Sequence, residues 1–390
     1  MKKSIFALAA VGVFAGGAHA QSSVTLYGIV DEGFNINTNA GGKHLYNLTS
    51  GVLQGSRFGL RGAEDLGGGM KAIFVLENGF DLNSGKLGQG GLMFGRQAYV
   101  GISSRFGTVT LGRQYDSVVD YVGLLEAGDQ WGGYLAAHPG DVDNFNNDFR
   151  TNNTVKYTSA DYGGLRFGGT YSFGGQAGNF TGNQIWSLGA SYNNGPLVLG
   201  VGYLNARQPG QANGLFGNNQ STGVASVVTT PVFSGYTSAN TYQVIGAGGA
   251  YTFGAATIGA TYSNTKFANL GADAPSAFRK GDTATFNNAE INFKYQFTPT
   301  FLMGAAFDYT DRSDMTEANG TRSGGAKYYQ GSIGADYYLS KRTDVYFIGV
   351  YQKASGTDSR NRPAVAAISN VTASANDRQL AARIGIRHKF

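Results

Sequence analysis

The chain ends with the stretch QLAARIGIRHKF, residues 379–390. Two series of side chains alternate in it. One series is Ala382, Ile384, Ile386, His388 and Phe390, and the other is Arg383, Gly385, Arg387 and Lys389. Because successive side chains of a strand point to opposite faces, one face is mostly apolar and ends in an aromatic ring, and the other is basic. This pattern is typical of a transmembrane barrel strand, whose outer face meets lipid and whose inner face meets water.

The beginning of the chain predicts export. Lys2 and Lys3 precede a short apolar stretch at residues 5–15, and Ala18-His19-Ala20 forms a small-x-small cleavage site. We expect cleavage after Ala20, so mass spectrometry of the outer-membrane protein should find Gln21 as the first residue. A retained leader would contradict this prediction. The apolar stretch is shorter than the roughly 20 residues that a transmembrane helix needs, and no later segment approaches that length. A membrane location therefore requires a barrel.

The composition agrees with a barrel and argues against disorder. The chain contains 61 Gly, 23 Tyr and 25 Phe, and aromatic residues make up 13% of it. Disordered chains are usually poor in aromatic residues, whereas Tyr suits a membrane interface. The absence of Cys excludes disulfides and thiolate metal sites and is compatible with an oxidising compartment.

Charge and histidine content indicate neither nucleic-acid binding nor catalysis. The 30 basic residues nearly balance 25 acidic ones and form no polybasic tail, so no nucleic-acid partner is predicted. His19 lies in the predicted signal, His44 and His138 in predicted outer loops, and His388 near the end. We therefore predict no metal site, no Ser–His dyad and no cofactor. The glycine run 67–69 opens a strand instead of a helix and so fails as a phosphate-binding motif.

Alternating segments of about ten residues follow one another along the chain. Long polar loops are predicted at 37–48, 81–91, 116–150, 175–182, 207–239, 268–283, 312–325 and 355–375. Tight turns are predicted at 65–69, 105–107, 161–164, 193–196, 253–255, 298–300 and 340–342. This alternation predicts about 16 strands, with turns facing the periplasm and loops facing outside. No linker divides residues 21–390, so one barrel domain follows the signal at 1–20. A soluble sandwich is the less favoured alternative.

The loop at 116–150 is longer than a barrel crossing requires. It carries many apolar residues, which folding against the inside of the wall would bury. They are Val118, Val119, Tyr121, Val122, Leu124, Leu125, Trp131, Tyr134 and Leu135. We therefore expect the loop to fold inward, and an exposed surface loop is the alternative.

Several motifs resemble the Gram-negative general porins, in particular their beta-proteobacterial branch. They are Tyr27-Gly28, SRFGLRG at 56–62, GRQAYVG at 95–101 and LGR at 111–113, and the resemblance covers essentially the whole mature chain. It implies an all-β, 16-stranded antiparallel transmembrane barrel that forms a homotrimer. It also implies that the third loop enters the lumen and that arginines on the wall face loop carboxylates. Phe390 would belong to the signal that the barrel assembly machinery reads.

The alternation of side chains along the strands and the resemblance to porins together predict which basic residues line the lumen. If Phe58 and Leu60 face lipid, Arg57 and Arg61 point into the lumen. The same reasoning places Arg96 inward with Tyr99 outward. It also places Lys71 and Glu77 inward, and Arg150 matches a constriction arginine of the family by position. A purely structural role, in which these groups pair with loop acids, is the alternative.

Glu126 and Asp129 are the acids expected opposite this wall, although the loop departs from the usual family motif there. Five other acids compete with them: Asp116, Asp120, Asp141, Asp143 and Asp148. Arg113 could hold the root of the loop or make a subunit contact.

These features predict a passive channel of the outer membrane for small hydrophilic solutes and ions, and no enzyme. Outer-membrane lipid, lipopolysaccharide and the assembly machinery are the expected partners. A substrate-specific channel is the first alternative, and a barrel adhesin or membrane enzyme is the second. The excess of bases over acids favours anions weakly.

Overall fold

The computed structural model describes residues 23–219, 228–272 and 275–390. The predicted signal peptide lies outside these residues. The strands are β1 Ser23–Ala40, β2 Lys43–Ser50, β3 Arg57–Gly67, β4 Met70–Gly79, β5 Gln97–Ser104, β6 Gly107–Gln114, β7 Thr151–Ser159, β8 Leu165–Ser172, β9 Ile185–Asn194, β10 Leu197–Arg207, β11 Thr241–Phe253, β12 Ala256–Ala268, β13 Ala284–Thr298, β14 Phe301–Arg312, β15 Met315–Thr316, β16 Arg322–Ser323, β17 Ala326–Tyr338, β18 Thr343–Gly356 and β19 Arg378–Lys389.

Helical structure is short in the described part of the chain. The α-helix α1 is Ser117–Tyr121, and a π-turn covers Gly128–Gly132. The 3-10 turns are Gln89–Gly91, Gly123–Leu125, Tyr134–Ala136, Pro139–Asp141, Leu215–Gly217 and Ser234–Tyr236. None of the described helices is long and apolar enough to span a membrane.

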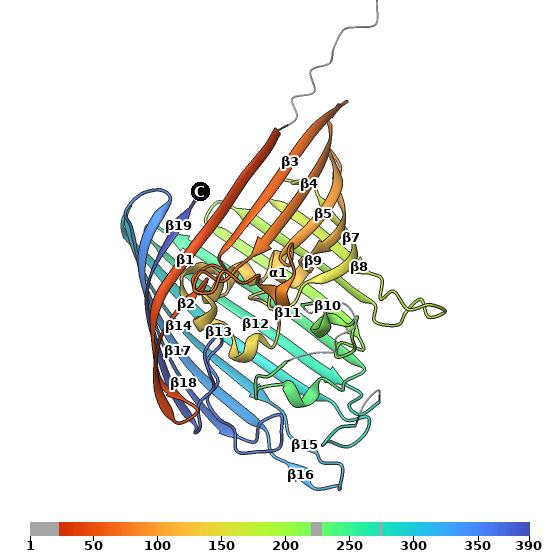
Figure 1. Ribbon diagram of the computed structural model, residues 1–390, viewed down its shortest axis with the longest axis vertical. Coiled ribbons are helices and arrows are strands. Elements are labelled where there is room, and N and C mark those ends of the chain that lie inside the picture. The colour runs from red at the N-terminus through yellow and green to blue at the C-terminus, as the bar shows by residue number, and fades with distance from the viewer. Residues whose placement is uncertain (1–22, 220–227, 273–274) are drawn as a thin grey trace, which may run out of the picture.

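One antiparallel sheet of 17 strands closes on itself through β1 and β19, whose paired residues run from Ile29 with Lys389 to Asn37 with Ala381. On its other side β1 pairs with β3 through Ser23–Ile29 and with β2 through residues 32–40. The segments β2 and β3 are therefore two halves of one crossing, and counting them once gives the predicted 16 strands. Figure 1 shows both described chain ends at one end of the barrel and the β15–β16 hairpin at the other.

The prediction of a long loop at residues 37–48 is wrong. Instead of a long loop at 37–48, β1 continues to Ala40, Gly41 and Gly42 form the turn, and β2 begins at Lys43. Both glycines have positive φ, of 59° and 97°, which suits residues without a Cβ. The second crossing is interrupted at residues 51–56 instead, where Val52 and Leu53 turn inward and are buried. Polar residues near the loop end of the strand hide its alternation in the sequence.

The alternation predicted for the last strand is confirmed. Ile384 and Ile386 are 64% and 49% exposed on the outer surface, whereas Arg383 and Arg387 are 1% and 6% exposed. Arg383 binds Asp31 at 3.2 Å, and Arg387 binds Asp344 at 2.8 Å. The basic inner face is thus neutralised largely by neighbouring wall carboxylates.

Phe390 extends the pairing of the last strand with β1, which closes the barrel. Its amide donates to Gly28 O, and the Gly28 amide donates to Phe390 O, both at 3.0 Å. A Cβ at Gly28 would overlap the Phe390 ring. We predict that Phe390→Ala will lower the yield of heat-modifiable oligomer while leaving the conductance of the molecules that do assemble unchanged. A normal oligomer yield would contradict this expectation.

Many aromatic side chains pack inside the barrel. A buried cluster joins residues 207–219 and 228–239 of the loop between β10 and β11 to the inward faces of β11–β13 and β17. Its aromatic members include Phe216, Phe233, Tyr236, Tyr242, Phe267, Phe278, Phe286 and Tyr328, each at most 2% exposed. The described residues of the 207–239 loop therefore also pack inward, besides the loop at 116–150.

Candidate constriction site

The segment 115–150, here called the inner loop, packs against the inside of the wall as predicted. Asp116 caps α1 by accepting from the amides of Val118 at 2.8 Å and Val119 at 3.3 Å. Burial raises the pKa of Asp116 to about 6, although those amides lower it. Val118, Val122, Leu125, Trp131 and Leu135 are at most 5% exposed. Of the predicted apolar anchors, Leu124 differs because it is 63% exposed.

Glycines of the wall make room for the inner loop. A Cβ at Gly200 of β10 would overlap the Tyr121 carbonyl, and a Cβ at Gly304 of β14 would overlap the Trp131 indole. Gly334 of β17 meets the same indole. The position of the loop thus depends on small residues on three strands.

Gly304→Leu should loosen the inner loop, because overpacking of this kind costs about 1 to 3 kcal/mol. We expect larger open-channel current fluctuations in planar bilayers. Gly331→Leu is the matched control, because a Cβ at Gly331 meets no atom within 4 Å. Equal fluctuations in both variants would argue against the packing role of Gly304.

Two arginines of the predicted basic wall meet at the inner loop. A Cβ at Gly55 would lie 3.0 Å from Arg96 Nη1, 3.6 Å from Tyr134 Oη and 3.8 Å from Arg57 Nη2. Arg57 is half-buried, and its Nε donates to Gly55 O at 2.8 Å. Arg57 takes part in none of the ion pairs formed by the described residues. Its positive charge is therefore not neutralised by direct contact with an acid.

Arg96, in contrast, is paired. Its Nε lies 2.8 Å from Glu77 Oε1, and both side chains are 5% exposed. Arg96 Nη2 also donates to Tyr115 Oη at 3.0 Å, and Tyr27 Oη donates to Glu77 Oε2 at 2.9 Å. The carboxylate of Glu77 and the two tyrosines fix the guanidinium in place and cancel much of its charge.

The predicted outward direction of Tyr99 is wrong. Val100 and Ile102 are 57% and 45% exposed on the lipid side. The side chain of Tyr99 lies on the opposite face of the strand and therefore points into the barrel. Arg96 nevertheless points inward because it precedes β5, in the irregular segment 92–96 where strand parity does not apply.

The two predicted acids lie in different environments. The side chain of Asp129 is exposed, and partial desolvation raises its pKa to about 7, whereas Arg57 and Arg96 both lower it. Glu126 is fully buried between the inner loop and the wall and does not face the lumen. Of Glu126 and Asp129, Asp129 is thus the acid that is exposed and on which both arginines act.

The other three predicted bases lie in different surroundings, and of these Arg150 lines the same cavity as Arg96. Arg150 is 3% exposed and lies 5.8 Å from the Tyr115 ring, with Nε and Nη2 unpartnered. Arg61 is exposed, and its guanidinium lies 5.3 Å from the Tyr27 ring. Lys71 lies opposite Asp65 in the β3–β4 ladder, beside the turn between these strands and six residues along β4 from Glu77. That spacing is about 20 Å, so Lys71 lies far from the pair formed by Glu77 and Arg96.

Arg113 holds the root of the inner loop. It donates to Gly95 O at 2.8 Å, to Asn152 Oδ1 at 2.5 Å and to Asn219 Oδ1 at 2.7 Å. These bonds tie the end of β6, where the inner loop begins, to the segment before β5, to β7 and to Asn219. They give Arg113 a structural role within the barrel.

Sequence reasoning did not find Lys156 of β7. Lys156 forms an ion pair with Asp120 of α1, and its Nζ donates to Tyr115 O at 3.2 Å. Val155 and Tyr157 are exposed on the lipid face, so Lys156 between them points into the barrel. This alternation could have identified Lys156 as a residue that lines the lumen.

A cavity of about 860 Å³ leads to this region. Its lining includes Arg96, Tyr134, Asp148 and Arg150, together with residues 367–373 of the loop before β19. The cavity therefore brings solute from the loop end of the barrel to the arginines.

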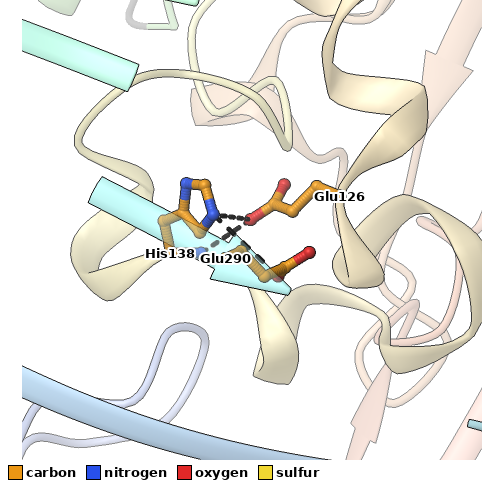
Figure 2. A group of neighbouring side chains, drawn as sticks. All are labelled: Glu126, His138 and Glu290. Atoms are coloured by element: carbon orange, nitrogen blue, oxygen red, sulfur yellow. Dashed lines mark hydrogen bonds and ion pairs between the residues drawn. The ribbon is translucent and has the colours of Figure 1, made fainter. Parts of the chain in front are cut away.

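A second polar cluster, centred on His138, lies where the inner loop meets the far wall. Figure 2 shows His138 and Glu126 from the loop beside Glu290 of β13. His138 was expected in an outer loop, yet it is fully buried. Burial raises the pKa of Glu126 well above its usual range, and Glu290 and Asp143 act in the same direction. Burial would lower the pKa of His138, but Asp143, Glu126 and Asp308 together raise it well above its usual range.

Comparisons with known sequences agree with this architecture. The profile of the Gram-negative porin family matches residues 7–357. An outer membrane porin protein of Bordetella pertussis is 31% identical over the full length of both chains. Outer membrane porin protein 32 of Delftia acidovorans is 29% identical, also over the full length of both.

Solved structures share the fold. The anion-selective porin from Comamonas acidovorans has a TM-score of 0.71 at 23% identity, and the match covers 95% of this chain and 100% of that one. A trimer form of OmpT from Vibrio cholerae has a TM-score of 0.63 at 16% identity, covering 95% and 99%.

Proposed function

Because this chain belongs to the Gram-negative porin family and forms an outer-membrane channel for passive diffusion, we propose that Arg57, Arg96 and Asp129 form its constriction. The channel was predicted from the sequence, and the family match confirms it. The family indicates a channel and not an enzyme. The observation that carries the proposal is the convergence of both guanidinium groups at Gly55 with Asp129 exposed in their field.

The charges of this constriction favour anions weakly. Glu77 compensates Arg96, Asp129 opposes Arg57, and Asp148 opposes Arg150 in the lining of the same cavity. Burial raises the pKa of Asp129 to about 7, so this acid carries less than a full charge near neutral pH. Positive charge is therefore in slight excess. Low-dielectric walls strengthen the field of such fixed charges compared with bulk water.

Small hydrophilic solutes pass without chemistry. Fixed charges of opposite sign across the gap orient water and dipolar solutes, and the inner loop sets the size limit. Apolar solutes are disfavoured because they would displace this oriented water. The aromatic cluster of the 207–239 loop is buried, so it offers no exposed track for a specific sugar.

Reversal potential in a potassium chloride gradient tests the proposal. The reconstituted wild-type channel should give a potential with the sign of modest chloride preference. A strong cation preference would contradict the proposed charge balance. Conductance that saturates at millimolar concentration of one solute would instead favour the substrate-specific alternative.

We further propose that the channel is a homotrimer with no cofactor required for conduction. Its apolar outer face would contact lipid and lipopolysaccharide, and Phe390 would be read by the barrel assembly machinery. The trimer form of the similar OmpT supports the oligomer. Cross-linking of the purified protein should give a trimeric limit, and a monomeric limit would contradict it.

A further inference from the structure

His138 aims an unpartnered nitrogen into a group of carboxylates. Its side chain is 0% exposed, and Nε2 has no hydrogen-bond partner. Three carboxylate oxygens surround this atom: Glu126 Oε1 at 3.8 Å, Glu290 Oε2 at 3.9 Å and Asp308 Oδ1 at 3.6 Å. Asp308 Oδ1 is also buried without a hydrogen-bond partner. Two neighbouring buried polar atoms are thus unsatisfied, which is rare in native interiors.

The imidazole is oriented by a fourth carboxylate. His138 Nδ1 lies 2.7 Å from Asp143 Oδ2, which also accepts from Ser263 Oγ at 2.6 Å and Asn288 Nδ2 at 3.2 Å. Because Asp143 accepts the Nδ1 proton, Nε2 is the ring nitrogen that would bind a cation, and it would release its own proton on binding. Metal-binding histidines commonly have this second partner.

In each of the three carboxylates that face His138 Nε2, the other oxygen accepts hydrogen bonds from neighbouring groups. Glu290 Oε1 accepts from the Ala127 amide at 2.9 Å and from Asn292 Nδ2 at 2.7 Å. Asp308 Oδ2 accepts from Thr310 Oγ1 at 3.2 Å, and Glu126 Oε2 accepts from Asn146 Nδ2. Each carboxylate therefore turns its other oxygen toward His138 Nε2.

The cluster lacks a balancing cation among the described residues. Every ion pair of Glu126, Asp143, Glu290 and Asp308 in this part of the chain is with His138. Four buried carboxyl groups therefore share one imidazole, and a buried carboxylate is costly unless it is paired or binds a metal.

We propose that His138 Nε2, Glu126, Glu290 and Asp308 bind a divalent first-row transition-metal ion, with Zn²⁺ as the probe. Zinc binds imidazole nitrogen and carboxylate oxygen at about 2.0 to 2.2 Å, so its tetrahedral ligand atoms lie roughly 3.3 to 3.6 Å apart. The distances from Nε2 to the three oxygens are 3.6 to 3.9 Å, so small side-chain shifts would close the site. Ligand atoms of Glu126, His138 and Glu290 all lie within 4.8 Å of one another. The imidazole favours a transition metal over Ca²⁺ or Mg²⁺.

Such an ion would tie the inner loop to the wall. Glu126 and His138 belong to the loop, whereas Glu290 and Asp308 lie on the neighbouring strands β13 and β14. The ion would replace electrostatic repulsion at this junction by direct bonds. It would therefore stabilise the folded position of the loop without entering the path of solutes.

Zinc content of the purified, folded protein tests the site. Samples are treated with EDTA, returned to zinc chloride, desalted and measured by mass spectrometry for elements. Wild-type protein should retain about one zinc ion per chain, and His138→Gln and Glu290→Gln should lose it. His44→Gln and Glu64→Gln remove an exposed imidazole and an exposed carboxylate as matched controls and should retain it. Wild-type protein without zinc, or His138→Gln with full zinc, would overturn the proposal.

A second variant covers the case in which the ligand variants fail to fold. Asp143→Asn keeps all four ligands but loses the orienting carboxylate, so zinc affinity should fall by about 10-fold to 100-fold. Crystals soaked in zinc should show an anomalous peak bonded to His138 Nε2. Unchanged affinity in Asp143→Asn together with no such peak would leave the cluster as a histidine-centred ion-pair network and contradict metal binding.

Discussion

Arg57→Glu should shift the zero-current potential of the reconstituted channel strongly toward cation selectivity. Arg57 has no ion-pair partner among the described residues, so its charge acts on passing ions, and the substitution changes that charge by two units. A unit charge at about 4 Å contributes about 1 kcal/mol even in bulk water. The permeability ratio should therefore change by roughly fivefold to 30-fold at low salt.

Two controls test whether the shift arises from the charge of Arg57: the salt concentration is varied, and the same kind of substitution is made at other positions. The shift should shrink as the Debye length falls from about 10 Å at 0.1 M to about 3 Å at 1 M. Arg96→Glu should act in the same direction, and Lys280→Glu, at an exposed outer loop, should act much less. An effect of Lys280→Glu as large as that of Arg57→Glu would place the selective region elsewhere.

Glu77→Gln should produce the opposite shift, toward anions. The substitution keeps the size of the side chain and an acceptor for Tyr27, but it removes the negative charge 2.8 Å from Arg96. Breaking a buried ion pair costs about 3 to 5 kcal/mol, and water in the lumen should reduce this cost. We expect more anion-selective zero-current potentials together with a lower unfolding temperature.

Glu64→Gln removes the same charge at an exposed position of β3 and is the matched control. It should leave both the potential and the unfolding temperature near the wild-type values. A shift of Glu77→Gln toward cations would mean that Arg96 does not act on the permeating ions.

The barrel could be predicted from the sequence because its physical constraint repeats on every strand. Lipid on one side and water on the other impose a period of two, as the exposed Ile384 and buried Arg383 show. The rule fails where the strand leaves this environment. It misses the inward turn at 51–56, and it gives the wrong direction for Tyr99 because parity was carried across the irregular segment before β5.

The details of the inner loop could be predicted less well, because they depend on contacts between distant residues. Its apolar anchors were visible in the sequence, but nothing local separates Glu126 from Asp129. Their difference arises because the loop next to Glu126 meets Glu290, where the Ala127 amide donates to the carboxylate. The burial of His138 has the same origin, since its neighbours Glu290 and Asp308 lie on other strands.

The most direct test of the account asks whether Asp129 lies at the narrowest part of the ion path. The natural chain has no Cys, so Asp129→Cys introduces a single reactive thiol. Addition of a negatively charged methanethiosulfonate reagent to the open reconstituted channel should reduce its conductance in discrete steps. Lys280→Cys, treated in the same way, should show little change. Efficient labelling of Asp129→Cys, verified by mass spectrometry, with no fall in conductance would contradict a constriction formed by the inner loop and the Arg57–Arg96 wall.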